Sequence, residues 1–388
     1  MKVMTPRLAS ELAEIVYQIK DPVASGIYDI VPTPGLQQTF ELDFSKHRVK
    51  GESGGFLGLF EKTSGFAVVG QGKQRYAGHY VVAARGTKSG HDWLTNGNVG
   101  YSTSTSGAYV HSGFNETFES MKEGLSRILT PRLSSGPVVG VHCVGHSLGG
   151  ALASLIAEWV SERYRKPVKL YSFGAPRVGL SGFATKITYS ASSHFRCTHG
   201  ADPVPNVPLW PFVHAPIDGS EYRLDSATGI SIDAHGMGRT AKPGYLNTAD
   251  TDDWNMLHQN SMNYLGHIVR LDYHRRDEAT FSGYWAEKIS AALITLLKDA
   301  GYYSAVIAQA AISSTMTFYD LLARTLEQIA DASKTLAEQT RGLLGHMLAF
   351  AKAAVTTVLE MTFSFIRWVF DQTAGALYAA VRQAIERN

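Results

Sequence analysis

The chain has 388 residues, of which 44% are hydrophobic and 18% are charged, and its formal net charge is +2. The apolar content is ample for a folded core, which excludes a disordered chain. The near balance of 36 basic and 34 acidic residues argues against a nucleic-acid partner, because little net charge is left to attract phosphate. The length predicts about two domains.

The first twenty residues carry Glu11 and Glu14 among apolar side chains and contain no long apolar run. This pattern predicts an amphipathic helix and not a secretory signal peptide. We therefore expect the protein to be cytoplasmic as synthesised. Export by a signal-independent secretion system, to act at a target-cell membrane, is the alternative route.

Residues 1–284 combine short apolar runs with Gly- and Pro-containing turns. Runs of apolar or β-branched residues predict strands at 66–69, 79–84, 138–144, 169–173 and 194–198. Helical patterns cover residues 115–129 and 148–163. Alternating strands and helices predict an α/β fold, with a mostly parallel sheet and helices on both faces.

The pattern G-x-S-x-G occurs at residues 145–149, with Ser147 at its centre. A predicted strand precedes it, and a small-residue helix start follows it. This context is typical of a nucleophile elbow, in which a strained turn lifts the serine hydroxyl clear of the sheet. The alternative is a glycine-rich turn around a buried serine.

With this elbow, the sequence resembles the class 3 lipases, the fungal-type branch of the α/β-hydrolases. The resemblance extends from about residue 65 to residue 270. Further segments fit the family in order: 81–87, 92–93, 110–114, 171–179, 202–205 and 212–214. The resemblance implies an α/β-hydrolase domain and a serine nucleophile.

A serine nucleophile needs a base, and the base needs an orienting acid. In α/β-hydrolases the order along the chain is Ser, Asp, His. Asp202 follows a predicted strand and resembles the family's triad aspartate. Histidines after Asp202 are the candidates for the base: His214, His235, His258, His267 and His274. We favour His258, which precedes a Tyr-containing segment as the family's catalytic histidine does, and keep His267 as the alternative.

The oxyanion hole is expected to use the backbone N–H of Leu148, the residue after the nucleophile. The resemblance adds Thr87 as the second donor. The segment that follows, 88–100, corresponds to the family's lid but has few large apolar residues. We therefore predict weak interfacial activation. The acidic stretch 249–254 is interpreted as a solvated loop, and we predict no metal and no cofactor.

Cys143 and Cys197 lie in predicted strands that a third strand separates. A two-strand gap of about 9.6 Å exceeds the reach of a disulfide. We expect two buried thiols.

Composition changes near residue 284, since no proline follows Pro243 and the tail has a helical period. We predict a lipase-like domain at 1–284 and a helical module at 285–388. The uncharged stretch 300–319 is favoured as a buried or interfacial helix over a membrane span. On a helical wheel, with successive residues about 100° apart, the charged residues from 320 to 371 fall on one arc. This pattern predicts one long helix, or two helices whose charged faces are in register. We expect a hinge at Gly342 and Gly345.

We therefore expect a serine-dependent lipase or esterase that cleaves acylglycerols or phospholipids through an acyl-enzyme, and that acts as a phospholipase effector at target membranes. The alternative is a lipase-like binding module. In that case the C-terminal helices would bind a membrane surface or a protein partner, such as an immunity or delivery protein.

Overall fold

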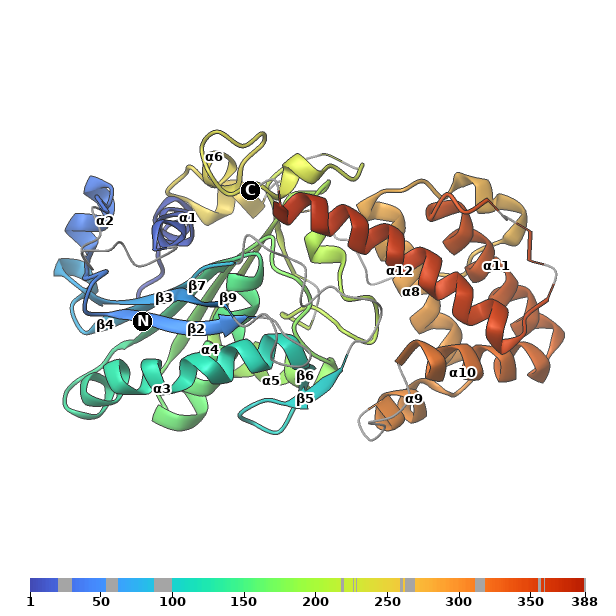
Figure 1. Cartoon of the computed structure of the whole chain (residues 1–388), viewed down its shortest axis with the longest axis horizontal. Helices are drawn as coiled ribbons and strands as arrows, with labels where there is room; N and C mark the ends of the chain where they lie inside the picture. The colour runs from blue at the N-terminus through green and yellow to red at the C-terminus, as the bar shows by residue number, and fades with distance from the viewer. Residues whose placement is uncertain are drawn as a thin grey trace.

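The computed structural model describes the chain except for residues 20–29, 54–61, 87–99, 218–219, 226, 228, 259–260, 262–268, 311–317, 355–356, 359 and 387–388. A sheet covered by helices on both faces occupies one part of the molecule, and a bundle of helices forms the other (Figure 1). This arrangement confirms the predicted α/β class with a helical C-terminal region.

The main sheet has eight strands among the described residues, in the order β1-β3-β4-β7-β8-β9-β10, with β2 also paired to β3. Within this sheet β4, β7, β8, β9 and β10 run parallel to one another, whereas β3 is antiparallel to β1, β2 and β4. The strand bounds are β1 Phe40–Leu42, β2 Arg48–Ser53, β3 Lys62–Gly72, β4 His79–Ala84, β7 Gly140–His146, β8 Val168–Phe173, β9 Ala191–Thr198 and β10 Tyr222–Arg223. A separate hairpin pairs β5 Tyr101–Thr103 with β6 Tyr109–His111.

Helices pack on both faces because the side chains of each strand alternate between them. Val82 and Ala84 of β4 face the core under α3 and α4, while Val81 and Ala83 face the core under α1. The α-helices of this part are α1 Pro6–Ile15, α2 Pro34–Thr39, α3 Ser112–Ser134, α4 Leu148–Tyr164, α5 Ser181–Ser190, α6 Tyr245–Thr248 and α7 Trp254–His258. The 3-10 turns are η1 Val16–Gln18, η2 Gln74–Tyr76, η3 Val204–Asn206, η4 Ile232–His235 and η5 Tyr273–Glu278.

The first helix, α1, confirms the amphipathic character predicted for the N-terminal residues, since its apolar side chains join the core over β4 and β7. The two cysteines are confirmed as buried free thiols. Strand β8 separates Cys143 on β7 from Cys197 on β9. Burial raises the pKa of both thiols, so neither is a reactive thiolate at neutral pH.

His111 caps the start of α3, because its Nδ1 accepts a hydrogen bond of 3.2 Å from the backbone N–H of Gly113. Burial lowers the pKa of His111 to about 4. In the unfolded chain an ordinary histidine has a pKa near 6.5, so the unfolded state binds the extra proton first as the pH falls. Its contribution to stability is therefore complete above about pH 6.5 and is lost towards pH 4.

We predict that His111→Asn makes the free energy of unfolding less dependent on pH. Asparagine also caps helices, so the hydrogen bond to Gly113 is kept while the titrating group is removed. Between pH 6.5 and pH 4, the loss of stability per pH unit is expected to be about 1.4 kcal/mol smaller in the variant than in the wild type. Urea unfolding at several pH values measures this slope, and equal slopes would contradict the assignment.

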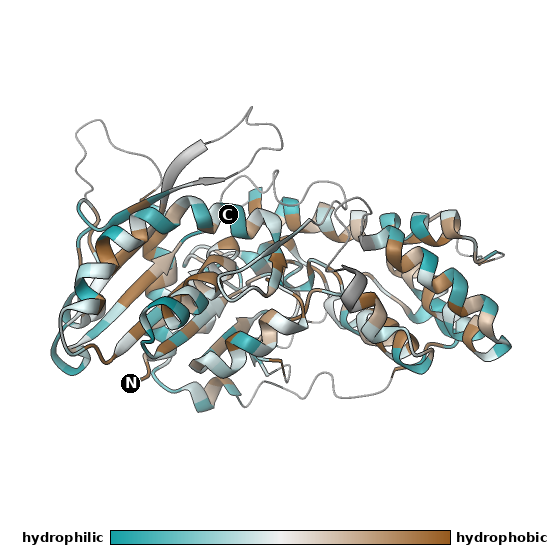
Figure 2. Cartoon of the chain, turned by 90° about the horizontal axis from the view of Figure 1, so that it is seen from below, coloured by the Kyte–Doolittle hydropathy of each residue, from teal (hydrophilic) through white to brown (hydrophobic). Residues whose placement is uncertain are grey.

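The C-terminal part consists of α8 Gly283–Asp299, α9 Tyr303–Ala310, α10 Phe318–Ala332, α11 Lys334–Phe350 and α12 Phe363–Glu386. Their apolar side chains form one core that also includes Val204, Val207, Leu209 and Trp210 of the sheet-containing part. Figure 2 shows the brown residues of these helices turned largely inward and the teal residues outward. The boundary predicted near residue 284 coincides with the start of α8 and stays a prediction, since the core is shared across it.

The predicted hinge at Gly342 and Gly345 is wrong. Both glycines lie inside α11, and the chain breaks instead at Ser333, which caps α11, and between α11 and α12. A Cβ atom on Gly342 would lie 1.8 Å from the carbonyl oxygen of Leu271, and one on Gly345 would lie 2.7 Å from the Tyr273 ring. The glycines are thus required for close packing of α11 against another segment.

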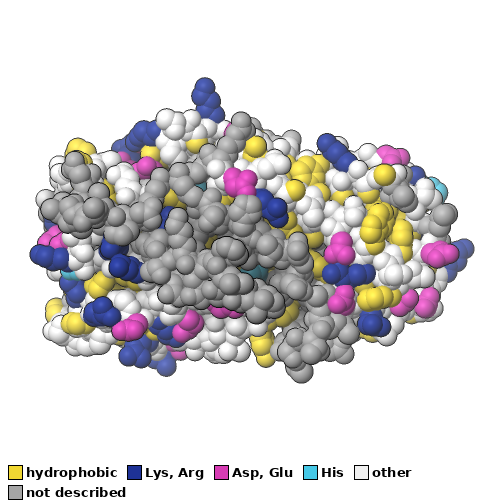
Figure 3. All heavy atoms as spheres, in the orientation of Figure 1, with side chains coloured by type: hydrophobic (Ala, Val, Ile, Leu, Met, Phe, Trp, Pro, Cys, Tyr) yellow, Lys and Arg dark blue, Asp and Glu magenta, His cyan; other side chains and the backbone are white. Residues whose placement is uncertain are grey.

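No helix of the described residues is long and apolar enough to cross a membrane. Part of the uncharged stretch 300–319 forms α9, and part of it lies outside the described residues. On the face in Figure 3, basic and acidic side chains are interspersed over the helical bundle, with hydrophobic side chains between them. Arg367 of α12 also pairs with Asp320 of α10, with 2.6 Å between Nε and Oδ1.

Candidate active site

Ser147 occupies the turn between β7 and α4, with φ 58° and ψ −133°. A positive φ is strained for a residue with a side chain, and such strain is typical of functional turns. The backbone N–H of Ser147 donates to the carbonyl of Phe173 on the neighbouring strand β8 (3.0 Å). The turn is therefore held against the sheet, as the elbow pattern predicts.

Glycines around Ser147 allow the strand, turn and helix to approach. A Cβ on Gly145 would lie 2.0 Å from the carbonyl oxygen of Gly149, and a Cβ on Gly149 would lie 2.2 Å from that of Ala84. These neighbours are backbone atoms, which cannot rotate away. Position 149 therefore admits only glycine without a shift of β4 or α4.

We predict that Gly149→Ala lowers the free energy of unfolding by about 3 kcal/mol, at the upper end of the cost of overpacking a core. Gly182 is a matched control, because it also lies in the first turn of a helix but has open space at its Cβ position. Gly182→Ala is expected to be neutral or slightly stabilising. Urea unfolding of both variants tests this, and equal effects would refute it.

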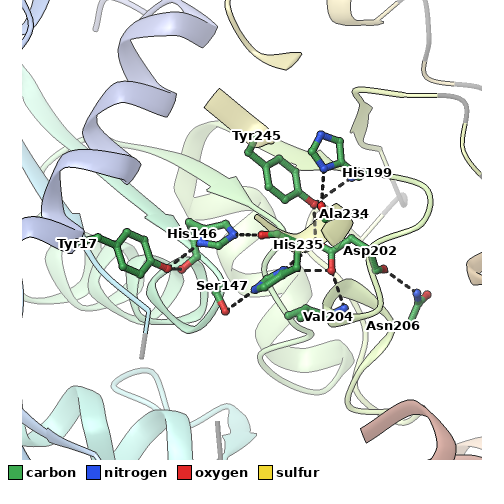
Figure 4. A network of polar contacts seen from close by, with 10 residues as sticks. All are labelled: Tyr17, His146, Ser147, His199, Asp202, Val204, Asn206, Ala234, His235 and Tyr245. Carbon is green, nitrogen blue, oxygen red and sulfur yellow. Dashed lines mark hydrogen bonds and ion pairs between the residues drawn. The ribbon is translucent and has the colours of Figure 1, made fainter. Parts of the chain in front are cut away.

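His235, and not His258, is the histidine beside Ser147. Its Nε2 lies 2.9 Å from Ser147 Oγ, and its Nδ1 lies 2.9 Å from Asp202 Oδ2 (Figure 4). Ser147, Asp202 and His235 are each at most 2% exposed. The sequence included His235 among the candidates but favoured His258, so that prediction is wrong.

His258 ends α7 and is exposed, and its ring lies 5.9 Å from that of Tyr222 on the edge strand β10. It is therefore placed beyond the last strand of the sheet and not at the elbow on β7. His214 is also used elsewhere, since its Nε2 donates to the carbonyl of Pro205 (2.7 Å). His274 is exposed in η5, and His267 lies outside the described residues.

Asp202 follows β9 and is held in place by several donors. The backbone N–H of Val204 donates to Oδ1 (2.9 Å), and the hydroxyl of Tyr245 donates to Oδ2 (2.7 Å). Burial and the neighbouring Asp202 raise the pKa of Tyr245, so its hydroxyl keeps its proton for this bond. These bonds orient the carboxylate towards His235.

Two further histidines hold the η4 segment that carries His235. His146 Nε2 donates to the carbonyl of His235 (2.8 Å), and His199 Nδ1 donates to that of Ala234 (2.6 Å). Figure 4 shows both histidines with their rings directed at these two carbonyl groups. No local sequence pattern distinguishes His235 from His258, because these partners come from β7 and from the end of β9.

The second nitrogen of His146, Nδ1, lies 2.7 Å from the hydroxyl of Tyr17, which donates to it. Burial and the nearby His235 lower the pKa of His146 well below its ordinary value. The ring of His146 is therefore neutral, although it lies 4.6 Å from the ring of His235. A neutral neighbour does not oppose a positive charge that develops on His235.

Leu148 begins α4, so its backbone N–H lies in the first turn, where N–H groups have no acceptor within the helix. This position agrees with the donor predicted for an oxyanion hole. Gly86 lies close to the elbow, because a Cβ there would be 3.1 Å from Ser147 Cβ. Thr87, the predicted second donor, lies outside the described residues, as do all residues of the predicted lid 88–100 except the last.

The acidic stretch before α7 is tied to the N-terminal helix. Arg7 pairs with Asp250 (2.6 Å) and with Asp252 (3.1 Å). Within the described ranges, no cluster of three or more His, Cys, Asp or Glu side chains is arranged to hold a metal ion. Asp250 and Asp252 thus have a basic partner within the chain.

Residues 81–212 match the family model described as Lipase (class 3). The chain is 36% identical over 130 residues to secreted mono- and diacylglycerol lipase 1 of Fusarium solani, covering 33% of this chain and 39% of that protein. It is 31% identical over 156 residues to secreted mono- and diacylglycerol lipase A of Penicillium camembertii, covering 39% and 50%. It is also 36% identical over 106 residues to Toxin TseL of Vibrio cholerae serotype O1, covering 27% and 16%.

The chain thus spans about half or less of the length of these relatives. Among solved structures, lipase II from Rhizopus niveus is similar with a TM-score of 0.44 and 23% identity, covering 57% of this chain and 79% of that one. This TM-score is too low to support the assignment of the fold, which rests on the strands and helices described above. The predicted cytoplasmic location, with signal-independent export, is contradicted, because the fungal relatives are described as secreted proteins.

The family match covers the sheet from β4 through the segment that follows Asp202, including the elbow. The glycines, the strained serine and the strand order agree with the α/β-hydrolase fold that the motifs predict. The segment from residue 81 to residue 212 is therefore similar to the class 3 lipases, and it lies within a sheet and helices arranged as in the α/β-hydrolases.

Proposed function

We propose that the protein is a serine-dependent carboxylic ester hydrolase that cleaves lipid esters through an acyl-enzyme. The observation that carries this proposal is the buried hydrogen-bonded series of Ser147 Oγ, His235 and Asp202, with 2.9 Å at each of its two links. Both distances lie within the reach required of a nucleophile and its base. In this proposal Ser147 is the nucleophile, His235 the base, and Asp202 the orienting acid.

In the first half of the reaction, Ser147 Oγ attacks the ester carbonyl carbon while its proton passes to His235 Nε2. The negative charge that develops on the carbonyl oxygen is stabilised by the N–H of Leu148, and Thr87 is proposed as the second donor. The tetrahedral intermediate then expels the alcohol, which takes the proton from His235. The product of this half is an ester between the acyl group and Ser147.

In the second half, water attacks the acyl-enzyme and gives its proton to His235. The intermediate expels Ser147 Oγ, which recovers that proton, and a fatty acid leaves. Asp202 stabilises the imidazolium in both halves and fixes the ring so that Nε2 faces the serine. The neutral His146 beside His235 is compatible with this transient charge.

The names of the relatives support acylglycerols as substrates, since the fungal proteins are mono- and diacylglycerol lipases. The similarity to Toxin TseL supports a second proposal, that the substrates include the phospholipids of a membrane that the protein attacks. In both cases the bond cleaved is a carboxylic ester. We also propose that the C-terminal helices contact the membrane surface or a protein partner.

The test is covalent labelling followed by a lipid panel. A fluorophosphonate is expected to add one adduct per chain, at Ser147, and to abolish release of fatty acid from mono- and diacylglycerols. Labelling elsewhere, or no release from any acyl ester, would favour the lipase-like binding module. Phosphatidyl lipids in the same panel separate the two substrate proposals, because glycerides alone would be cleaved if the phospholipid proposal is wrong.

A further inference from the structure

We propose that Glu287, on the C-terminal helix α8, is a positioning residue for Asp202 and acts on it through Arg177. The inference rests on the proposed function, because it concerns the aspartate of that triad. Glu287 lies outside the segment that matches the lipase family, residues 81–212. The helical tail would thus contribute directly to the geometry of the active site.

Arg177 follows β8 and is almost completely buried, with its side chain 5% exposed. Its Nη1 donates to the carbonyls of Asn206 (2.6 Å) and Pro208 (2.9 Å). Its backbone N–H donates to the carbonyl of Val207 (2.8 Å). One arginine therefore holds three consecutive residues of the segment after Asp202.

The same segment holds Asp202 itself. The N–H of Val204 donates to the Asp202 carboxylate, and Nδ2 of Asn206 donates to the Asp202 carbonyl (3.2 Å). Arg177 and Asp202 are thus connected through Asn206, which bonds to both. A displacement of Arg177 would move the segment on which the orientation of the carboxylate depends.

A buried guanidinium needs a counter-charge, because carbonyl groups satisfy its donors but not its charge. Glu287 supplies it, with Oε1 2.6 Å from Arg177 Nη2, and its own side chain is 26% exposed. Removing the carboxylate leaves the arginine in a low-dielectric environment without its partner. The arginine is then expected to shift towards water or to another acceptor.

Water has room to compete at this point. Arg177, Asp202, Asn206 and Glu287 all line one cavity of about 620 Å³ between α8 and the sheet-containing part. The ion pair between Arg177 and Glu287 therefore joins α8 to the sheet-containing part at the cavity. Side chains are not closely packed at this point. This is why we assign a positioning role to the carboxylate in addition to its effect on stability.

A second contact leads from the tail to the other end of the triad. Helix α12 packs against η4, the turn that carries His235, and also against η3. Figure 1 shows α12 running from the bundle back to the sheet-containing part, where the C-terminus lies. The tail thus contacts the segments that carry both Asp202 and His235. Of these contacts, the ion pair of Glu287 can be tested by removing a single charge.

The experiment compares Glu287→Ala and Glu287→Gln with Asp299→Asn in the full chain. Asp299 is a matched control, since it lies on the same helix and pairs with Arg270 at 2.9 Å, but it has no bond to the Asp202 segment. Activity is measured on a soluble short-chain ester. Each rate is divided by the concentration of active sites, which is the amount of protein that a fluorophosphonate labels at completion. Unfolded protein is therefore not counted.

Glu287→Ala is expected to lower kcat about tenfold with little change in KM, and to slow fluorophosphonate labelling by the same factor, because small displacements at a catalytic group are costly. Glu287→Gln keeps an oxygen that accepts from Arg177 and is expected to recover part of the loss, to about threefold. Asp299→Asn is expected to stay within about twofold of the wild type.

Wild-type values of kcat and of the labelling rate in both Glu287 variants would overturn the inference, as would an equal loss in Asp299→Asn. A loss that appears only in KM would also overturn it, because it would place Glu287 in substrate binding. Failure of the proposed function gives a different result: the wild type itself would neither cleave the ester nor label at Ser147.

Discussion

Replacing His235 with alanine is expected to lower kcat for a soluble ester by a factor on the order of 10⁶, whereas His258→Ala is expected to leave it unchanged within about twofold. The reason is the geometry: His235 Nε2 lies 2.9 Å from Ser147 Oγ, while His258 is exposed beside Tyr222. Without His235, no described base is placed to accept the serine proton. The loss corresponds to about 8 kcal/mol of transition-state stabilisation.

Steady-state kinetics on both variants measure this contrast. Thermal unfolding of His235→Ala serves as the control for folding, because His235 is buried and its carbonyl anchors η4 through His146. Near-normal activity in His235→Ala, or a comparable loss in His258→Ala, would contradict the assignment of the base. The two variants thus discriminate directly between the histidine favoured by the motif and the one placed by the fold.

Ser147→Ala is expected to remove activity by a similar factor, on the order of 10⁶, and to abolish labelling by a fluorophosphonate. Alanine deletes only the hydroxyl, while the strained turn and the N–H of Leu148 stay in place. Because the residues of a triad act as a unit, Ser147→Ala combined with His235→Ala is expected to be no worse than either alone. The residual rate reports what the oxyanion donors and substrate binding contribute.

The measurement is the rate of ester hydrolysis at high enzyme concentration, with fluorophosphonate labelling in parallel. Preparations of Ser147→Ala from separate expressions guard against trace contamination by another esterase. If a substantial share of the wild-type rate survived Ser147→Ala, the acyl-enzyme mechanism would be refuted. Multiplicative losses in the double variant would show that Ser147 and His235 act independently.

Several elements of the fold were predictable because they depend on short-range patterns. The runs that form β4, β7, β8 and β9 are apolar or β-branched and are bounded by turn residues. The elbow at Ser147 was also predictable, since Gly145 and Gly149 are required wherever strand, turn and helix approach so closely. In the same way, the separation of the two cysteines follows from the order of the strands.

Short-range patterns did not predict correctly where the helices of the C-terminal tail begin and end. Charged residues from 320 to 371 share one face of a helical wheel, yet the chain there forms three helices. The glycines interpreted as a hinge are buried in contacts with Leu271 and Tyr273. A glycine that permits close packing and one that permits bending look the same in a sequence, and only the partner segment tells them apart.

The sequence by itself predicted the α/β class, the similarity to class 3 lipases and the candidate residues Ser147 and Asp202, because both residues follow a strand and are part of a local motif. The choice of histidine required the tertiary structure. His235 reaches Ser147 because His146 and His199, far away in the chain, bind the carbonyls of η4, and because α12 packs against that turn. Contacts of this kind depend on how distant segments meet, and no spacing along the chain encodes them.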